Sequence, residues 1–266
     1  MKSNIKEDRM ATVSEIYTYL NTLLPRSLSC EWDNDGLMVC GNPNSEVKKI
    51  LFTLDITMQA VEYAEKIGAD LIISHHPLIF KGIKHMNGED ITSKKVIRLL
   101  QSGISAMSFH TRLDAAEGGI NDILAETLEL QNIQKFEAEE GLDSRFGDLA
   151  HEMTFEDFCL FVKEKLGAPS ILASKGKDTV SRVAVLGGAG KDAIFSAMAT
   201  GADAYLTGEA SYHGLLDAME MGFSVLTTGH DFTENAFFTY FKKALNEKFD
   251  GLMFAENPVK CALYHF

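Results

Sequence analysis

Two adjacent histidines follow an apolar run that is typical of a buried strand. The run is Leu71-Ile72-Ile73, and Ser74-His75-His76-Pro77 comes directly after it. Neighbouring residues on a strand point to opposite faces, so both imidazoles can serve one site only where the strand ends and the backbone turns. Pro77 favours such an ending, because it lacks an amide hydrogen and restricts His76 to extended geometry. Ligands and metals gather at the carboxyl ends of strands in open α/β sheets, so this run predicts a site.

Three further predicted strand ends carry an imidazole and a carboxylate four residues apart. The pairs are His110 with Asp114, Glu209 with His213, and His230 with Glu234. On a first helical turn this spacing places both side chains on one face. Six of the eight histidines lie at these four strand ends or just beyond one of them, at positions 75, 76, 85, 110, 213 and 230.

The donor residues at these strand ends include no cysteine. Imidazole nitrogens and carboxylate oxygens suit Zn²⁺, Mn²⁺, Fe²⁺ or Co²⁺, and the sequence does not choose among them. A carboxylate such as Glu234 could bridge two cations, and a water between two metals would be ionised near neutral pH. We therefore expect a metal site, with two ions favoured over one.

The composition is that of an ordinary soluble protein with two domains. Of its 266 residues, 45% are hydrophobic and 24% charged. The formal charge of −13 argues against a general nucleic-acid or anionic-membrane binder. No window approaches the ~18 apolar residues of a membrane span, and residues 1–10 lack the apolar region of a signal peptide. The four cysteines are scattered like reduced thiols, so we expect a cytoplasmic protein.

Alternating strand and helix patterns predict an α/β fold. The expected helices cover residues 13–24, 57–67, 93–102 and 118–128, with another starting at Thr154, and the expected strands cover 47–55, the apolar run from Leu71 that leads to the two histidines, 104–109 and 183–186. The glycine loop at residues 187–191 lacks the spacing of a phosphate-binding loop, which favours a tight strand-to-helix turn. Residues 31–37 are expected to form a polar surface turn with Trp32, the only tryptophan, packed beneath it.

The second half of the chain repeats the first. Residues 64–76 align without gaps to residues 197–209, which places His76 opposite Glu209. Such self-similarity predicts two similar α/β domains related by internal duplication. We expect a first domain over residues 1–130, which the C-terminal segment could complete, and a second over 131–266, with the metal site in the cleft between them.

Five segments that span nearly the whole chain carry a resemblance to a known family. They are Trp32-Asp33-Asn34-Asp35-Gly36-Leu37, Ser74-His75-His76-Pro77-Leu78-Ile79-Phe80, Ser108-Phe109-His110-Thr111-Arg112-Leu113-Asp114, Thr207-Gly208-Glu209 and Gly229-His230-Asp231-Phe232-Thr233-Glu234. Together they resemble the NIF-three-like family, also called the GTP cyclohydrolase I type 2 family of dinuclear metal-centre proteins.

The resemblance implies a homohexameric toroid of two-domain subunits, each with two divalent ions (Zn, Fe or Mn). The metal ligands that it implies are His75, His76, Asp114, His230 and Glu234. Glu234 would bridge the two ions. His110 lies close to the centre in the family pattern, either as a partner that orients a ligand or as a proton carrier, and is the candidate catalytic residue. Glu209 and His213 belong to the signature as cleft-lining residues.

Two features depart from the family pattern. The roughly 50 residues in the middle leave no room for the extra domain that longer members carry there. The family's G-x-G-R-x-G pattern appears as Gly141-Leu142-Asp143-Ser144-Arg145-Phe146-Gly147, with Ser144 in place of a glycine. This change affects the expected shape of the turn and not the site.

Two classes of function follow from the resemblance. The first is a metal-dependent hydrolase that opens the guanine ring of GTP and releases formate. Arg112, Lys81 and Lys84 lie near the metal strand ends and could meet a triphosphate, although solvated surface charges are the simpler interpretation. The alternative is a non-catalytic, metal-binding hexamer that acts as a scaffold or regulator. We favour the enzyme, with a nucleotide substrate, no membrane partner and no nucleic-acid partner.

Overall fold

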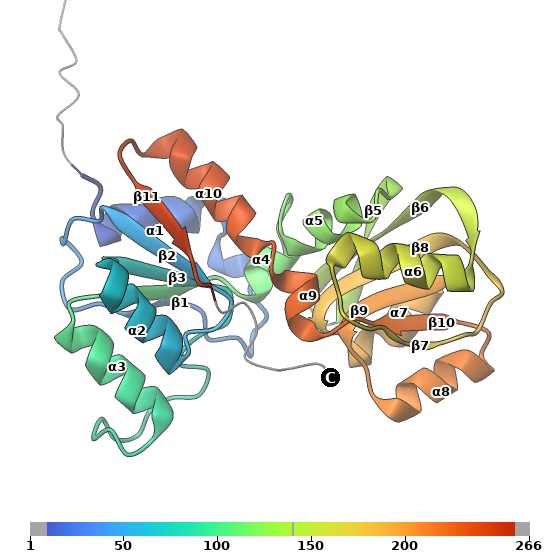
Figure 1. Ribbon diagram of the computed structural model, residues 1–266, viewed down its shortest axis with the longest axis horizontal. Coiled ribbons are helices and arrows are strands. Elements are labelled where there is room, and N and C mark those ends of the chain that lie inside the picture. The colour runs from blue at the N-terminus through green and yellow to red at the C-terminus, as the bar shows by residue number, and fades with distance from the viewer. Residues whose placement is uncertain (1–9, 140, 259–266) are drawn as a thin grey trace, which may run out of the picture. The chain divides into compact units, whose positions relative to one another are not determined.

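The computed structural model describes residues 10–139 and 141–258, which form two compact units (Figure 1). The first unit contains residues 10–23, Asn34–Phe109 and 241–258, and the second contains Leu24–Asp33 and His110–Tyr240. Residues 1–9, which make up most of the N-terminal stretch considered above, and Cys261 lie outside the described residues. Within the described ranges, no helix is long and apolar enough to cross a membrane.

The first unit is built on a five-stranded sheet with the order β1-β4-β3-β2-β11. All neighbours are parallel except β1, which runs antiparallel to β4. The strands are β1 (Gly36–Val39), β2 (Lys49–Thr53), β3 (Leu71–Ser74), β4 (Ser105–Ser108) and β11 (Met253–Glu256). The helices are α1 (Val13–Leu23), α2 (Met58–Ile67), α3 (Ile91–Gln101) and α10 (Phe237–Lys248), of which residues from Phe241 onward belong to this unit.

The strand that precedes the two histidines is buried along its whole length. β3 pairs with β2 on one side and β4 on the other. Leu51, Ile72 and Ala106 pack with α2 and α3 on one face of the sheet, and Phe52 stacks on Phe241 of α10 on the opposite face. Figure 1 shows α2 and α3 on one side of this sheet and α1 and α10 on the other. Helices on both faces explain why β3 reads as a continuous apolar run.

The second unit is built on a six-stranded sheet with the order β5-β6-β8-β9-β10-β7. The central strands β8, β9 and β10 are parallel, and β5, β6 and β7 run antiparallel to their neighbours. The strands are β5 (Gln131–Glu139), β6 (Leu142–Thr154), β7 (Leu172–Ser174), β8 (Thr179–Ala189), β9 (Ala204–Glu209) and β10 (Ser224–Thr227). The helices are η1 (Arg26–Leu28), α4 (Thr111–Ala115), α5 (Ile120–Thr127), α6 (Phe155–Leu166), η2 (Lys191–Ala193), α7 (Ile194–Ala199), α8 (Tyr212–Glu220) and α9 (His230–Glu234).

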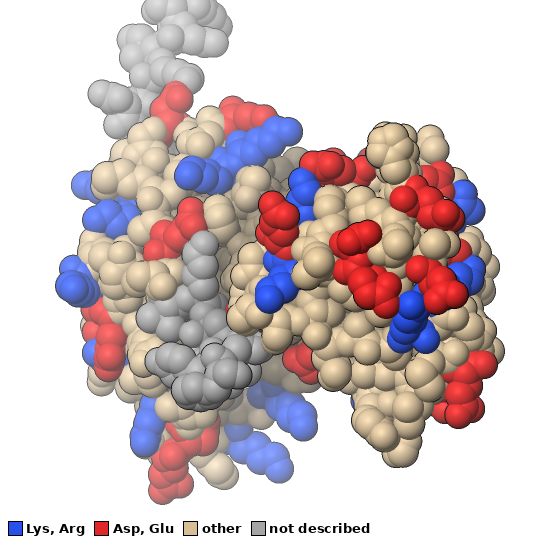
Figure 2. All heavy atoms as spheres, turned by 45° about the vertical axis from the view of Figure 1, so that its right-hand side comes forward, with Lys and Arg blue, Asp and Glu red and all other residues tan. Residues whose placement is uncertain are grey.

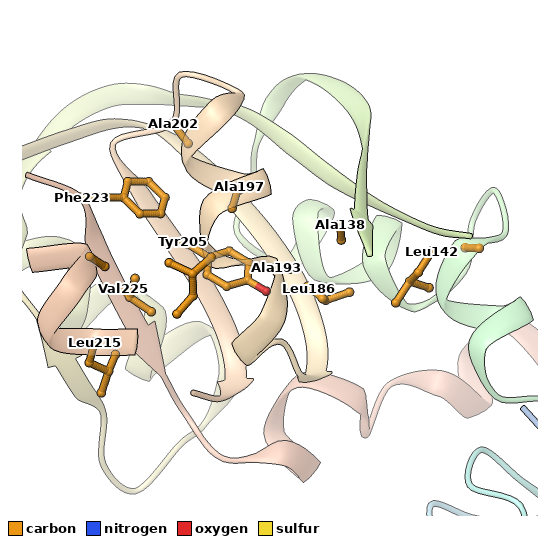
Figure 3. Close-up of a cluster of buried hydrophobic side chains, with 14 of the residues drawn as sticks. Ala138, Leu142, Leu186, Ala193, Ala197, Ala202, Tyr205, Leu215, Phe223 and Val225 are labelled. Atoms are coloured by element: carbon orange, nitrogen blue, oxygen red, sulfur yellow. The ribbon is translucent and has the colours of Figure 1, made fainter. Parts of the chain in front are cut away.

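Two apolar clusters cover the two faces of this sheet. In the cluster of Figure 3, Tyr205 and Leu186 of the sheet pack with Ala197 of α7 and Leu215 of α8. The second cluster packs α5 and α6 against the alternate residues of the same strands, which point to the opposite face. The central strands β8, β9 and β10 are therefore covered on both faces, like those of the first unit.

The two units share a topology, as the internal repeat predicts. Strands β2-β3-β4 and β8-β9-β10 are each parallel and joined through helices. The aligned residues Asp70 and Asp203 also accept equivalent hydrogen bonds in the two units. The carboxylate of Asp70 accepts hydrogen bonds from two amides at the start of β2, and that of Asp203 accepts them from two amides near the start of β8. The repeat therefore extends from sequence to individual hydrogen bonds.

Within the stretch from Gly141 to Gly147, where a turn was expected, only Gly141 lies in a turn and the other residues form a strand. Only Gly141 has a positive φ, of +76°, and from Leu142 onward the chain is β6. The hydroxyl of Ser144 donates to the carbonyl of Val185 in β8. The expectation of a changed turn at Ser144 was therefore wrong, because this residue lies inside a sheet whose next strand accepts its hydroxyl.

Candidate metal centre

The first unit presents two oriented imidazoles at the carboxyl end of β3. His75 is fully buried, and its Nδ1 lies 3.1 Å from the carbonyl oxygen of Phe109. Nδ1 of His76 lies 2.9 Å from Oδ1 of Asp55. Because these oxygens only accept hydrogen bonds, the proton of each neutral ring lies on Nδ1 and the lone pair on Nε2. Metal-ligating histidines are held in this way in proteins.

The second unit gathers one imidazole and two carboxylates. His230 and Glu234 lie on the single turn of α9, so the predicted shared face is confirmed. Nε2 of His230 lies 3.2 Å from Oε2 of Glu234, and Nδ1 lies 2.9 Å from Oε1 of Glu209. A carboxylate oxygen of Glu234 lies within 4.8 Å of one of Asp114. Both carboxylates are buried, with Glu234 3% and Asp114 7% exposed.

This arrangement fits a divalent cation. Glu209 accepts a hydrogen bond from Nδ1 of His230, so a neutral His230 ring turns its Nε2 lone pair towards the carboxylate of Glu234. Two acceptors at that distance repel each other unless a cation or a proton lies between them. Metal–nitrogen and metal–oxygen bonds of about 2.0–2.2 Å place neighbouring ligand atoms about 3 Å apart, close to the observed spacing. The buried carboxylates of Glu234 and Asp114 also repel each other, and a cation would offset that repulsion.

The side chains that could hold a metal ion in the described part of the chain are His75, His76, His110, Asp114, His230 and Glu234. Among them are all five ligands that the resemblance implies. Whether these five act as ligands stays a prediction.

Gly188 keeps space open beside the donors of the second unit. Its φ is +70°, in the left-handed region that favours glycine. A Cβ at this position would overlap Oε1 of Glu234 and lie 3.1 Å from Nε2 of His230. β8 ends at Ala189 and η2 begins at Lys191, so the predicted tight strand-to-helix turn is confirmed. The glycine also lets the backbone pass close to two candidate ligands.

Two of the side chains that accept hydrogen bonds from the glycine loop also donate hydrogen bonds to the backbone of candidate metal ligands. Three backbone amides of the loop donate to side chains: Gly187 to Asn121 (2.9 Å), Gly188 to Thr233 (2.9 Å) and Gly190 to Thr207 (3.0 Å). The hydroxyl of Thr233 donates to the carbonyl of His230, and the amide group of Asn121 donates to the carbonyl of Asp114. The donors and the loop are therefore positioned by one hydrogen-bond network.

Comparison with known proteins identifies the family. Residues 11–260 match the family model described as Duf34/NIF3 (NGG1p interacting factor 3). The chain belongs to the Duf34/NIF3 family.

Its relatives match it over most of their length. A Clostridium perfringens protein named GTP cyclohydrolase 1 type 2 homolog is 32% identical over 224 residues, which cover 82% of this chain and 85% of that protein. The protein NIF3 homolog of Schizosaccharomyces pombe is 33% identical over 254 residues, which cover 89% and 87%. The crystal structure of a Bacillus cereus protein related to NIF3 superposes with a TM-score of 0.87 at 24% identity, covering 97% of this chain and 99% of that one. That structure has the same fold.

In this Duf34/NIF3 chain, His110 is held by the carboxylate of Asp33, which is not one of the candidate metal ligands. Its Nδ1 lies 3.0 Å from Oδ1 of Asp33. Thr111 donates to the other oxygen of Asp33 from its amide (3.1 Å) and from its hydroxyl (2.6 Å). Burial raises the pKa of Asp33, but the hydrogen bond and positive charge of His110 and the two bonds from Thr111 outweigh it and lower the pKa to about 2. Asp33 is therefore an ionised, fixed partner of His110.

Replacing Asp33 by asparagine is expected to lower the free energy of unfolding by about 2 kcal/mol near pH 7. The pKa of Asp33 is depressed in the folded state, from 3.8 to about 2. Its stabilisation is therefore complete above the unfolded value and is lost as the pH falls through about 2. Urea unfolding of both proteins between pH 7 and pH 2 measures this, and the difference between them should shrink over that range. A difference that stays constant with pH would contradict the ionised state of Asp33.

Two side chains lie elsewhere than the sequence indicated. Trp32 was expected beneath its turn but is 56% exposed, with its ring 6.0 Å from that of His110 and inclined at 73°. The turn itself is held by Asp33, whose carboxylate binds the His110–Thr111 segment in place of the indole. Arg112 is buried and donates to the carbonyl of Leu24, so it is no triphosphate contact.

Glu209 and His213 do not share one helical turn, contrary to the expectation from their spacing. Glu209 is the last residue of β9, and His213 lies in α8 after the N-cap Ser211. Glu209 holds His230, whereas His213 is exposed and contacts the ring of Tyr212. Lys81 and Lys84 are exposed, as expected of solvated charges, whereas Arg112 is not. His85 is exposed as well and is not among the candidate metal ligands of the described residues.

Sequence reasoning missed the residues that orient the donors. Asp55 was seen only as the end of a strand, and Gly188 only as part of a turn. A carboxylate at the end of a predicted strand is the signal that could have found Asp55. Nothing in the sequence points to Gly188, because its role depends on the approach of α9 to β8, which are far apart along the chain.

Proposed function

We propose that the chain binds two divalent ions through His75, His76, Asp114, His230 and Glu234, and that it is a metal-dependent hydrolase of the GTP cyclohydrolase 1 type 2 kind. The observation that carries the metal part is the orientation of the imidazoles. His75, His76 and His230 each donate a hydrogen bond from Nδ1 to an oxygen acceptor, so Nε2 of each neutral ring carries the lone pair that a cation would bind. Buried Glu234 is the proposed bridging ligand.

The candidate ligands of each unit support this proposal, but neither unit alone has enough of them for two ions. The first unit supplies two imidazole nitrogens, and the second supplies one imidazole and two carboxylates. Catalytic zinc sites use three protein ligands for one ion, so two ions need more donors than either unit offers. The proposal that both sets serve one dinuclear centre rests on this count and on the match of all five residues to the family pattern.

The chemistry is divided between the ions and the residues around them. Bound divalent ions would supply Lewis acidity and lower the pKa of water towards neutrality. His110 donates a hydrogen bond from Nδ1 to the carboxylate of Asp33 and offers Nε2 to accept or deliver a proton, and that carboxylate stabilises the imidazolium that forms. The substrate is taken from the relatives named GTP cyclohydrolase 1 type 2 homolog, and the reaction is hydrolytic opening of the guanine ring of GTP with release of formate.

The proposed assembly is a homohexamer in the cytoplasm. The assembly follows from the family resemblance, and a monomer in light scattering would overturn it. The free thiols of Cys30, Cys40 and Cys159 support a reducing compartment. Nucleic acid is not proposed as a partner, because acidic residues outnumber basic ones by 38 to 25. Figure 2 shows acidic side chains at many places on the face in view, with basic ones among them.

Formate release from GTP tests the proposed reaction. Wild-type protein and its Glu234→Ala variant are loaded separately with Zn²⁺, Mn²⁺ and Fe²⁺, and the metal content of each sample is measured. We expect wild-type protein to release formate in proportion to its bound metal, and the variant to have lost both. A Glu220→Ala variant is the control, because Glu220 is an exposed carboxylate on α8 and should behave like wild type.

If the wild-type protein binds two metal ions but releases no formate, GTP is not the substrate and the proposal of a metal centre is still supported. That outcome would favour the second candidate, a non-catalytic metal-binding protein that acts through a partner. The observation behind this alternative is the description of the family as an interacting factor.

A further inference from the structure

Trp32 has no part in the proposed metal chemistry, yet it lies beside it. It is the only tryptophan of the chain and is 56% exposed, although large aromatic side chains usually contribute their area to a core or an interface. Its ring is edge-on to that of His110, with centroids 6.0 Å apart. An exposed indole therefore stands next to the proposed proton carrier.

The backbone on both sides of Trp32 is fixed. The amide of Cys30 donates to the hydroxyl of Thr111 (3.0 Å), and the amide of Asp33 donates to the carbonyl of Cys30 (3.0 Å). Arg26 donates to the carbonyl of Asp33 (2.6 Å), whose carboxylate holds His110 and Thr111. The indole is therefore presented by a loop whose backbone is hydrogen-bonded on both sides of it, which lowers the ordering cost for a ligand that binds there.

We propose that Trp32 is the surface on which the planar base of the substrate stacks, beside His110. This inference rests on the proposed function for the kind of base, a purine. Exposed aromatic rings bind nucleobases through their faces, and this interaction needs no positive charge. That matters in a chain with a formal charge of −13, because this net charge repels a triphosphate. Stacking would bind the uncharged end of the nucleotide.

Tryptophan fluorescence tests the proposal directly, because Trp32 is the only tryptophan and therefore the source of all tryptophan emission. Metal-free wild-type protein is titrated with GTP and GMP, and in parallel with ribose 5-phosphate and tripolyphosphate, which lack the base. N-acetyltryptophanamide at the same nucleotide concentrations corrects for absorbed light. We expect saturable quenching by the two nucleotides and none by the compounds without a base. Quenching no greater than that of the free indole compound would overturn the proposal.

Substitutions separate stacking from a structural role. Equilibrium dialysis with labelled GMP is expected to show binding about 5- to 150-fold weaker for Trp32→Leu, the range that stacking of one base contributes. Trp32→Phe should restore most of it, because a planar ring returns. Phe195→Leu is the control, since Phe195 is an aromatic residue of similar exposure (53%) on α7 and should leave binding unchanged. Equal binding by Trp32→Leu and wild type would overturn the proposal.

Two further results distinguish this inference from the proposed reaction. Saturable quenching without any formate would uphold stacking on Trp32 and remove the GTP cyclohydrolase reaction. Formate release with the same KM in wild type and Trp32→Leu would uphold the reaction and overturn stacking. A Trp32 emission spectrum that shifts when the ligand-free protein is diluted would also overturn it, because the ring would then be covered by a second copy of the chain.

Discussion

Replacing Gly188 by alanine is expected to remove metal from the second unit's donors while the fold remains. The new Cβ would overlap Oε1 of Glu234, whose side chain is buried and has little room to move. Loss of a group that merely orients a metal ligand commonly costs 10- to 100-fold in metal affinity. Displacing a ligand itself should cost at least about 100-fold. Metal content after dialysis against a metal buffer, and calorimetric titration with Zn²⁺, measure the effect.

Gly201→Ala is the matched control for this change. Gly201 has a similar φ of +78°, and a Cβ there would meet nothing within 4 Å. Both substitutions impose the left-handed backbone on an alanine, at a cost of about 1–2 kcal/mol in stability. Only Gly188→Ala should lose metal. Equal metal binding by the two variants would show that Gly188 does not shape the centre.

Replacing Arg145 by methionine is expected to destabilise the second unit by about 3–5 kcal/mol. Arg145 is 1% exposed and pairs with the carboxylate of Asp122. It also donates to the carbonyls of Ser144 (3.1 Å) and Ala116 (3.1 Å). Methionine has a similar length but no donor, so the carboxylate and these carbonyls would lose their partner inside the protein. Urea unfolding of the full chain, followed by far-UV circular dichroism, measures the change.

Two variants show whether the buried charge is the cause. Arg98→Met removes an arginine that bridges Glu62 and Glu65 on the surface of the first unit, and it should change stability little because exposed ion pairs are screened. The double variant Arg145→Met/Asp122→Leu removes both charges of the pair, of which Arg145 is buried and Asp122 half-buried, and should recover much of the loss. A single Arg145→Met variant as stable as wild type would contradict this account of the pair.

The sequence was sufficient where one strand or one helical turn decides the outcome. β3 could be predicted because its four residues are buried on both faces of a parallel sheet, and His75 and His76 follow where it ends. His230 and Glu234 share a face because four residues make about one turn of α9. The repeat is visible in the sequence because equivalent backbone amides of the two units donate to Asp70 and to Asp203, so an aspartate is required at both positions.

Glu209 and His213 were wrongly expected to share a helical turn, because β9 includes Glu209. Glu209 and His213 have the same separation as His230 and Glu234, but Glu209 is still part of β9. A strand end can shift by one or two residues with its pairing, and here Glu209 pairs with Ala189 of β8. Partners from another strand are not encoded in local spacing.

By itself, the sequence determined the α/β class, the duplication and the candidate donors, since each depends on local periodicity or on residues within one turn. Only the tertiary structure decided what orients those donors. Asp55 meets His76 across 21 residues, Asp33 meets His110 across 77, and Gly188 makes room for Glu234 on another element. The physical reason is that a hydrogen bond or a steric clearance between distant residues depends on how the strands are paired and covered, which no short window of sequence contains.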